Sequence, residues 1–141
     1  MTAEQPALHR LFTAVELPED TRASLAALQG DFPSMRWVHP SRMHLTLRFI
    51  GEVDAACAEA VRQSLASVQA VPFVLRLKRL GSFYRRPSGT LWAGFEANSR
   101  LLDLHVQTTV KVLISLNTSS LRAVPVRDLP IRLSVPPTRV I

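Results

Sequence analysis

Apolar and polar residues alternate strictly between positions 43 and 49 of the chain. The apolar positions are Met43, Leu45, Leu47 and Phe49, and the polar positions between them are His44, Thr46 and Arg48. A repeat of two is typical of a strand with one buried face, so we expect the apolar set to face a core. Residues two apart on a strand are separated by roughly 6 to 7 Å. His44 and Thr46 are therefore expected to present an imidazole and a hydroxyl side by side on one rigid face.

Turn residues and further repeats divide the rest of the chain into strands and helices. Pro18 ends an apolar strand, Gly30 ends the helix after it, and Asp54 is a candidate N-cap. Gly51 is expected to end the central strand. Strands are thus predicted at 9–17, 35–38, 43–49, 71–80 and 90–95, a loop at 81–89, and helices at 18–29, 55–68 and from Asn98 or Ser99 to 116. The last helix has apolar positions at Leu101, Leu102, Val106, Val110, Leu113 and Ile114, and residues 131–135 show a short alternation.

Composition indicates one globular domain over the 141 residues, with 47% hydrophobic and 20% charged residues. No apolar run reaches the roughly 18 to 20 residues of a membrane span, and residues 1–5 carry no basic patch, so we expect no membrane segment, no signal peptide and a cytoplasmic location. Cys57 is the only cysteine, which excludes an intrachain disulfide, and its alanine-rich surroundings indicate a small packing residue. The four histidines lack zinc-ligand spacing, so no metal or other cofactor is expected.

The net positive charge of the chain favours negatively charged partners. The formal net charge is +6, the sequence pI is 11.0, and the excess is rich in arginine. Guanidinium groups match phosphate oxygens, so phosphate-bearing partners are favoured. Charge does not separate a nucleic-acid binder from an enzyme that acts on a phosphodiester.

Three blocks of the sequence carry a resemblance to a known family. These are residues 10–18 (RLFTAVELP), 43–53 (MHLTLRFIGEV) and 90–94 (TLWAG). From Arg10 to about Leu104 the chain resembles the 2H phosphoesterase superfamily, specifically the bacterial RNA 2′,3′-cyclic phosphodiesterases, also called 2′-5′ RNA ligases. The second block resembles the first His-x-Thr motif of that family. The resemblance covers about two thirds of the chain.

The resemblance implies a fold and a metal-free mechanism. The expected fold is a bilobal α+β domain over residues 1–141, with antiparallel sheets forming a central groove and helices outside. Each lobe of the family places one His-x-Thr strand in the groove, so that two imidazoles serve as acid and base. By this resemblance His44 is the general acid and Thr46 binds phosphate. The implied substrate is RNA or a cyclic nucleotide, and the protein is expected to act as a monomer.

The sequence departs from the family pattern in its last part. The only histidine after His44 is His105, whose spacing to Thr108 and predicted helical setting do not fit the second motif. Pro130 and Arg132 stand about where that motif is expected, and proline transfers no proton. Residues 117–141 are rich in proline and arginine. We interpret them as divergent or altered sequence.

Three hypotheses follow. The first is hydrolysis of cyclic phosphodiesters to 2′-phosphates, with reversible 2′-5′ ligation as a related reaction. The second is binding of RNA or nucleotide phosphates without catalysis, since the second motif is missing. The third is a poorly folded product. Candidate phosphate or nucleotide contacts outside the motif are Arg48, Tyr84, Arg86 and Arg132, together with a basic strand face at Arg76 and Lys78.

Overall fold

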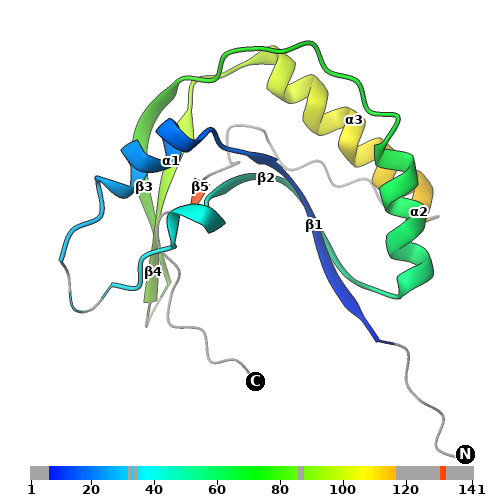
Figure 1. Ribbon diagram of the computed structural model, residues 1–141, viewed down its shortest axis with the longest axis horizontal. Helices are drawn as coiled ribbons and strands as arrows, with labels where there is room; N and C mark the ends of the chain where they lie inside the picture. Colours follow the sequence, from blue (N-terminus) through cyan, green and yellow to red (C-terminus); the bar gives the residue numbers. More distant parts are fainter. Residues whose placement is uncertain (1–6, 32, 34, 86–87, 117–130, 133–141) are drawn as a thin grey trace, which may run out of the picture. The chain divides into compact units, whose positions relative to one another are not determined.

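The computed structural model describes residues 7–31, 33, 35–85, 88–116 and 131–132, and omits the side chains of residues 84, 85, 88, 131 and 132 (Figure 1). The elements in chain order are β1 (His9–Glu16), α1 (Glu19–Ala26), the 3-10 helix η1 (Pro40–Arg42), β2 (His44–Val53), α2 (Ala55–Leu65), β3 (Leu77–Arg85), β4 (Ser88–Phe95), α3 (Ser99–Leu116) and β5 (Ile131–Arg132). The predicted α+β class is confirmed. No helix in these ranges has the length and apolar character that a bilayer span requires.

The chain passes repeatedly between two compact units. Unit 1 comprises Met1–Thr13, Leu47–Val74 and Asn98–Val126, and unit 2 comprises Ala14–Thr46, Leu75–Ala97 and Arg127–Ile141. The five strands follow the order β1-β2-β5-β4-β3, and β5 pairs antiparallel with both β2 and β4. The groove between lobes that the resemblance implies stays a prediction.

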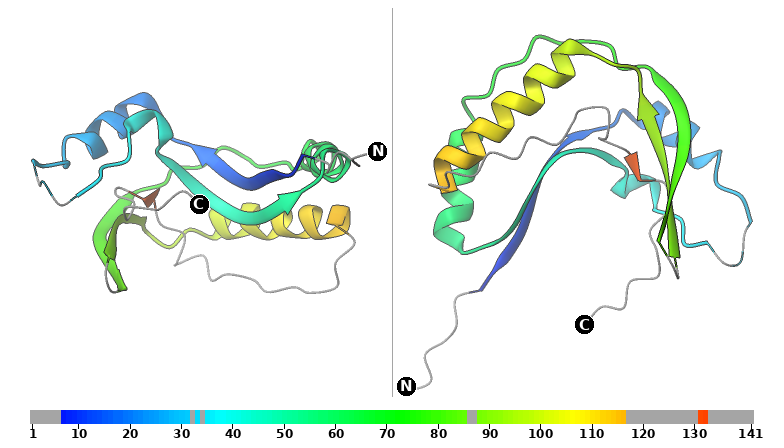
Figure 2. Two further views of the ribbon diagram at one scale, coloured as in Figure 1. Left: turned by 90° about the horizontal axis from the view of Figure 1, so that it is seen from below. Right: turned by 180° about the vertical axis from the view of Figure 1, so that it is seen from behind.

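Unit 1 is built around the packing of α2 against α3 (Figure 2). The Ser64 hydroxyl of α2 donates to the Lys111 carbonyl of α3 at 3.2 Å. Both helices have side-chain N-caps, because the Asp54 carboxylate accepts from the Cys57 N–H at 2.8 Å and the Asn98 amide oxygen accepts from the Arg100 N–H at 2.9 Å. Of the two caps proposed for the third helix, Asn98 is therefore the one used.

Unit 2 contains the long β3–β4 hairpin, with Gly81 paired to Trp92 and Phe83 paired to Thr90. Its buried apolar residues include Leu25 of α1, Leu45 of β2 and Ala93 of β4. These residues share no sequence neighbourhood, so the core of this unit forms only when the sheet and α1 come together.

Two predicted strands differ in the structure. The strand expected at 35–38 is wrong, since only an isolated bridge forms at Trp37, whose indole N–H donates to the Gly30 carbonyl at 2.7 Å instead. The strand expected at 71–80 is wrong in its first half: residues 71–76 are irregular, and β3 begins at Leu77 and runs through Gly81 to Arg85. The loop expected at 81–89 is consequently wrong over residues 81–85 and 88–89, and residues 86–87 lie outside the described part of the chain.

Element ends also differ from the sequence prediction. Gly51 does not end β2, which continues to Val53 because glycine accommodates the φ of 98° found there without steric cost. The helices α1 and α2 end earlier than expected, at Ala26 and Leu65. The first, central and last helices are otherwise confirmed.

Part of the predicted apolar burial is wrong. Phe49 is 61% exposed and meets the Phe12 ring at a centroid distance of 6.2 Å. On α3 the apolar positions Leu102, Val106, Val110 and Ile114 are exposed. The helix buries the predicted positions Leu101 and Leu113, and its buried face also includes three polar residues, His105, Thr108 and Thr109. Hydrophobicity therefore predicted only part of the buried side of this helix.

Candidate active site

His44 and Thr46 lie on the half-buried face of β2, as the alternation predicts. Met43, Leu45 and Leu47 are 2%, 0% and 4% exposed, whereas His44 and Thr46 are half-buried. The three apolar side chains fix one side of the strand in a core, so the imidazole and the hydroxyl emerge from the other side. Their spacing along the strand is roughly 6 to 7 Å. Both groups can therefore contact one small anion.

The segment that leads into β2 is held by side-chain hydrogen bonds within unit 2. The Gln29 amide donates to the Val38 carbonyl at 2.9 Å, which connects the end of α1 to this segment. The His39 Nδ1 atom lies 2.7 Å from the Ser41 hydroxyl and accepts from the Ser41 N–H at 3.3 Å. These bonds fix η1 immediately before the strand. Several hydrogen bonds thus fix the backbone immediately before His44.

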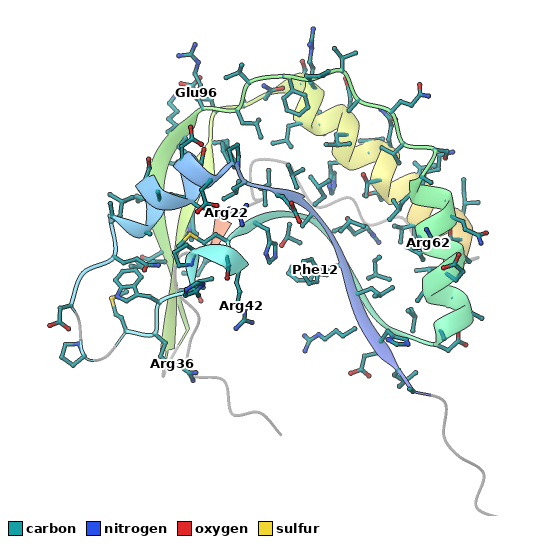
Figure 3. The ribbon with its side chains drawn as sticks, in the orientation of Figure 1. Phe12, Arg22, Arg36, Arg42, Arg62 and Glu96 are labelled. Carbon is teal, nitrogen blue, oxygen red and sulfur yellow. The ribbon has the colours of Figure 1, made fainter. Side chains whose placement is uncertain are left out.

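Exposed arginines precede the strand. Arg36 and Arg42 belong to the segment that leads from α1 to β2, and Figure 3 labels both. Arg42 lies in the last turn of η1, two residues before His44. Guanidinium groups attract phosphate. These arginines were not predicted as site residues, although a basic residue next to a candidate motif is a sequence signal for a phosphate contact.

The other predicted contacts are placed as follows. Arg48 is half-buried on β2 in unit 1, and its carbonyl accepts from the Thr13 hydroxyl at 3.5 Å. The backbone of Tyr84 pairs with Gly89, and the backbone of Arg132 pairs with Trp92. The side chains of Tyr84 and Arg132, and the whole of Arg86, lie outside the described part of the chain. Their phosphate-binding roles stay predictions.

Arg76 and Lys78 do not form the basic strand face that was expected. Arg76 precedes β3, and its carbonyl accepts from the Glu96 N–H at 2.8 Å. Lys78 lies where the pairing between β3 and β4 shifts in register between Leu77 and Arg79. The irregularity interrupts the alternation on which the prediction rested.

A cluster that was not predicted from the sequence lies on the hairpin. The rings of Phe83 and Trp92 stack with a centroid distance of 5.6 Å and an interplanar angle of 28°. The guanidinium carbon of Arg79 lies 5.4 Å from the centroid of the Trp92 ring. Arg79, Gly81 and Phe83 occur at alternate positions of β3. Recognising that β3 continues through Gly81 would have revealed the cluster.

His105 lies in the core of unit 1. It is 1% exposed, and its Nδ1 atom lies 2.9 Å from the Leu47 carbonyl oxygen. The interpretation of His105 as a helix residue outside the catalytic centre agrees with this setting. A buried ring bonded to a backbone carbonyl cannot reach a substrate in this arrangement.

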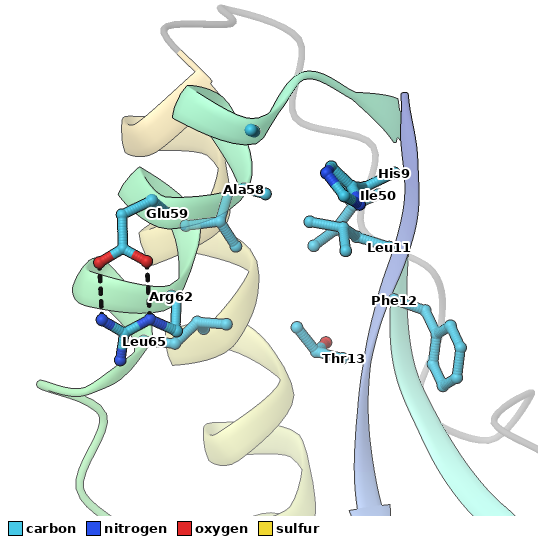
Figure 4. Close-up of a pocket in the computed structure, with 11 residues that line it drawn as sticks. His9, Leu11, Phe12, Thr13, Ile50, Ala58, Glu59, Arg62 and Leu65 are labelled. Carbon is cyan, nitrogen blue, oxygen red and sulfur yellow. Dashed lines mark hydrogen bonds and ion pairs between the residues drawn. The ribbon is translucent and has the colours of Figure 1, made fainter. Parts of the chain in front are cut away.

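A separate hollow of about 390 Å³ lies between α2 and β1 of unit 1 (Figure 4). Its lining is mostly aliphatic and includes Leu11, Ile50 and Leu65. Arg62 at its edge is held by Glu59, with an N–O distance of 2.6 Å. The hydrogen bonds from Arg62 and Gln63 lower the pKa of the Glu59 carboxyl to about 2. None of the predicted site residues lines the hollow, and its apolar walls do not suit a phosphate.

Comparisons with known proteins identify relatives. Residues 15–92 match the family model described as LigT like Phosphoesterase. The chain is similar to the RNA 2′,3′-cyclic phosphodiesterase of Geobacillus stearothermophilus (31% identical over 100 residues, 66% of this chain and 32% of the relative) and to that of Methanocaldococcus jannaschii (32% over 109 residues, 73% and 60%). The chain therefore spans less than two thirds of either relative.

A solved structure supports the same relationship. E. coli LigT complexed with 3′-AMP matches with a TM-score of 0.75 and 26% sequence identity, over 96% of this chain and 77% of that protein. The segment matched by the family model includes β2 and the hairpin strands β3 and most of β4.

Proposed function

Because the chain belongs to the LigT-like phosphoesterases, we propose that it hydrolyses 2′,3′-cyclic phosphodiesters of RNA or nucleotides and leaves a 2′-phosphate. The observation that carries this proposal is the presentation of His44 and Thr46 on one face of β2, with Leu45 buried on the other. A strand backed by a core holds an acid and a hydrogen-bond donor at a fixed spacing, as phosphoryl chemistry requires.

In the proposed reaction a water oxygen bonds to phosphorus while the bond from phosphorus to the ribose 3′ oxygen breaks. The His44 imidazolium gives its proton to that leaving oxygen, which becomes a 3′ hydroxyl. The Thr46 hydroxyl donates to a non-bridging oxygen, where negative charge increases. The proton of the attacking water passes to bulk solvent. With a ribose 5′ hydroxyl in place of water as the nucleophile, the same step forms a bond from phosphorus to the 5′ oxygen, breaks the bond to the 3′ oxygen and leaves a 2′-5′ linkage.

A second candidate function is binding of RNA or nucleotide phosphates without turnover. It is favoured by one observation: the sequence contains no histidine after His44 except His105, which is buried and bonded to Leu47. Without the histidine of the second motif, the site lacks the imidazole that would act as general base for the water. Phosphate recognition by Thr46 and nearby cations does not need that base.

The substrate and setting are part of the proposal. The relatives named as RNA 2′,3′-cyclic phosphodiesterases and the E. coli LigT complex with 3′-AMP support a nucleotide or RNA substrate. We expect the protein to act as a monomer in the cytoplasm, without a metal or other cofactor. The interpretation of residues 10–104 as family-like and of residues 117–141 as divergent, within one domain, also stays a prediction.

An assay on an oligonucleotide that ends in a 2′,3′-cyclic phosphate tests the function. Conversion to the 2′-phosphate is expected with the unmodified chain and is expected to fall by roughly 10²- to 10⁴-fold in His44→Ala. His9→Ala, which removes an exposed histidine from β1, is the matched control and should retain the rate. Equal rates in the unmodified chain and His44→Ala would exclude His44 from the mechanism. Binding without turnover would support the second candidate.

A further inference from the structure

The stacked cluster of Arg79, Phe83 and Trp92 lies on the same sheet face as His44 and Thr46. Residues paired across an antiparallel ladder point to the same face. Leu45 pairs with Ile131, and Ile131 pairs with Ala93. Leu45 and Ala93 are 0% and 1% exposed, so they share the core face of unit 2. The neighbours of both, including His44 and Trp92, therefore point to the opposite face.

The same alternation determines the sheet face to which the other side chains of the cluster point. Gly81 is opposite Trp92, and Phe83 is opposite Thr90, two residues further along the hairpin. Phe83 thus points to the same face as Trp92, which agrees with the stacking of their rings. Only one strand, β5, separates β2 from β4. Strands are spaced by about 4.8 Å, so Trp92 lies roughly 10 Å across the sheet from the candidate motif.

The chemistry of the cluster suits a nucleobase. Phe83 is 53% exposed although it is a large apolar ring, and one side of the pair is extended by the Arg79 guanidinium. Aromatic rings exposed on a strand face, together with arginine, are a common means of binding unpaired bases of single-stranded RNA. The guanidinium also attracts the phosphate backbone.

The glycines around the indole keep it flat against the hairpin. A Cβ atom at Gly81 would overlap the Trp92 ring, and one at Gly94 would lie 2.9 Å from the Cζ3 atom of that ring. The indole therefore lies across both backbone positions and cannot turn toward them. A ring fixed in this way loses little conformational entropy when a base stacks beside it.

We propose that Phe83, Trp92 and Arg79 form a base-stacking site for the RNA nucleotide next to the one that carries the cyclic phosphate. This inference rests on the proposed function, because it assumes that the phosphate binds at His44 and Thr46. Phe83, the exposed ring of the stack, lies on β3, three strand spacings of about 4.8 Å each from β2. We therefore assign the stack to the neighbouring nucleotide and not to the one that carries the cyclic phosphate. The site would make the protein prefer RNA chains to cyclic mononucleotides.

Fluorescence anisotropy with a hexanucleotide that ends in a 2′,3′-cyclic phosphate tests the site. Phe83→Ala is expected to weaken binding roughly tenfold, because loss of one base–aromatic stack has about this effect. Phe83→Tyr, which keeps the ring, is expected to restore binding. Leu80→Ala is the matched control, since Leu80 is 60% exposed on the same strand and pairs with the core residue Ala93. Its affinity should stay unchanged.

Two further probes separate stacking from other effects. Adenosine 2′,3′-cyclic phosphate should bind Phe83→Ala and the unmodified protein equally, and a hexanucleotide without a base at the penultimate position should bind the two equally. Unchanged hexanucleotide affinity in Phe83→Ala, an equal loss in Leu80→Ala, or no effect of the missing base would overturn the site. If the hexanucleotide binds as expected but is not hydrolysed, the stacking site stands and the proposed catalysis fails.

Discussion

The Nδ1 atom of His105 lies 2.9 Å from the carbonyl oxygen of Leu47, the residue that follows Thr46 on β2. A carbonyl oxygen only accepts, so Nδ1 carries the proton and donates it. The ring is 1% exposed, and its Nε2 atom has no hydrogen-bond partner among the described residues. This bond joins α3 to the strand that carries the candidate motif.

We expect His105→Ala to destabilise the fold by about 3 kcal/mol, since it leaves a cavity and an unpaired buried carbonyl. His105→Asn should be less damaging, because its amide nitrogen is the same number of bonds from Cβ as Nδ1. His105→Leu fills the space but lacks a donor. Urea denaturation of the three variants measures the difference. If Asn and Leu are equally destabilising, the hydrogen bond does not contribute to stability.

Replacements of Thr46 should distinguish the contribution of its hydroxyl to catalysis from that of its methyl group. Thr46→Val keeps the shape but removes the donor, and we expect it to lower kcat/KM by roughly 10²-fold, since one such donor stabilises the developing charge. Thr46→Ser should retain most of the rate. Steady-state kinetics on the cyclic oligonucleotide gives both values. A Val variant as active as the Ser variant would mean that the hydroxyl does not contact the phosphate.

The lowered pKa of Glu59 predicts how the stability of α2 depends on pH. Hydrogen bonds from Arg62 and Gln63 lower it from 4.5 to about 2. Because the folded-state pKa is lowered, the contribution of this pair to α2 is present above pH 4.5 and is lost as the pH falls toward 2. In Arg62→Gln the carboxyl pKa should rise toward 4.5, and in Gln63→Ala it should rise less. Carboxyl ¹³C titration by NMR measures both, and an unshifted pKa in Arg62→Gln would contradict the pairing.

Gly81 is expected to tolerate no side chain. In Gly81→Ala the new methyl group would overlap the Trp92 indole, and we expect a loss of about 1 to 3 kcal/mol in the free energy of unfolding. Ser82→Ala, on the opposite face of the same strand, is the control and should have little effect. The loss should shrink when Trp92→Leu is already present, because the ring is gone. Thermal denaturation of the single and double variants tests this coupling.

The sequence was informative where local patterns decide the structure. The alternation around Leu45 predicted both the strand and the common face of His44 and Thr46. Asp54 supplied a cap signal that needs no tertiary contact. Such features depend on neighbours within a few residues, which a single sequence contains.

Tertiary contacts decided the remaining features. Gly81 and Gly51 are typical turn residues, yet both lie inside strands. At Gly81 the Trp92 indole packs on the backbone and leaves no room for a side chain. At Gly51 the backbone has a φ of 98°, which glycine adopts without steric cost. The α3 helix buries His105 and exposes Ile114, because the available contacts lie on the side that bears the imidazole. The Phe83 and Trp92 stack depends on strand register. No local pattern contains these relationships.

The position of β5 has a consequence for biosynthesis. This strand lies between β2 and β4 in the sheet, although it follows both by many residues in the chain. Until β5 has emerged from the ribosome, the edges of β2 and β4 that pair with β5 lack their partner strand. Unpaired strand edges invite association with other chains. Translation speed and chaperone binding before β5 is synthesised are therefore expected to govern how much of the protein reaches its native state.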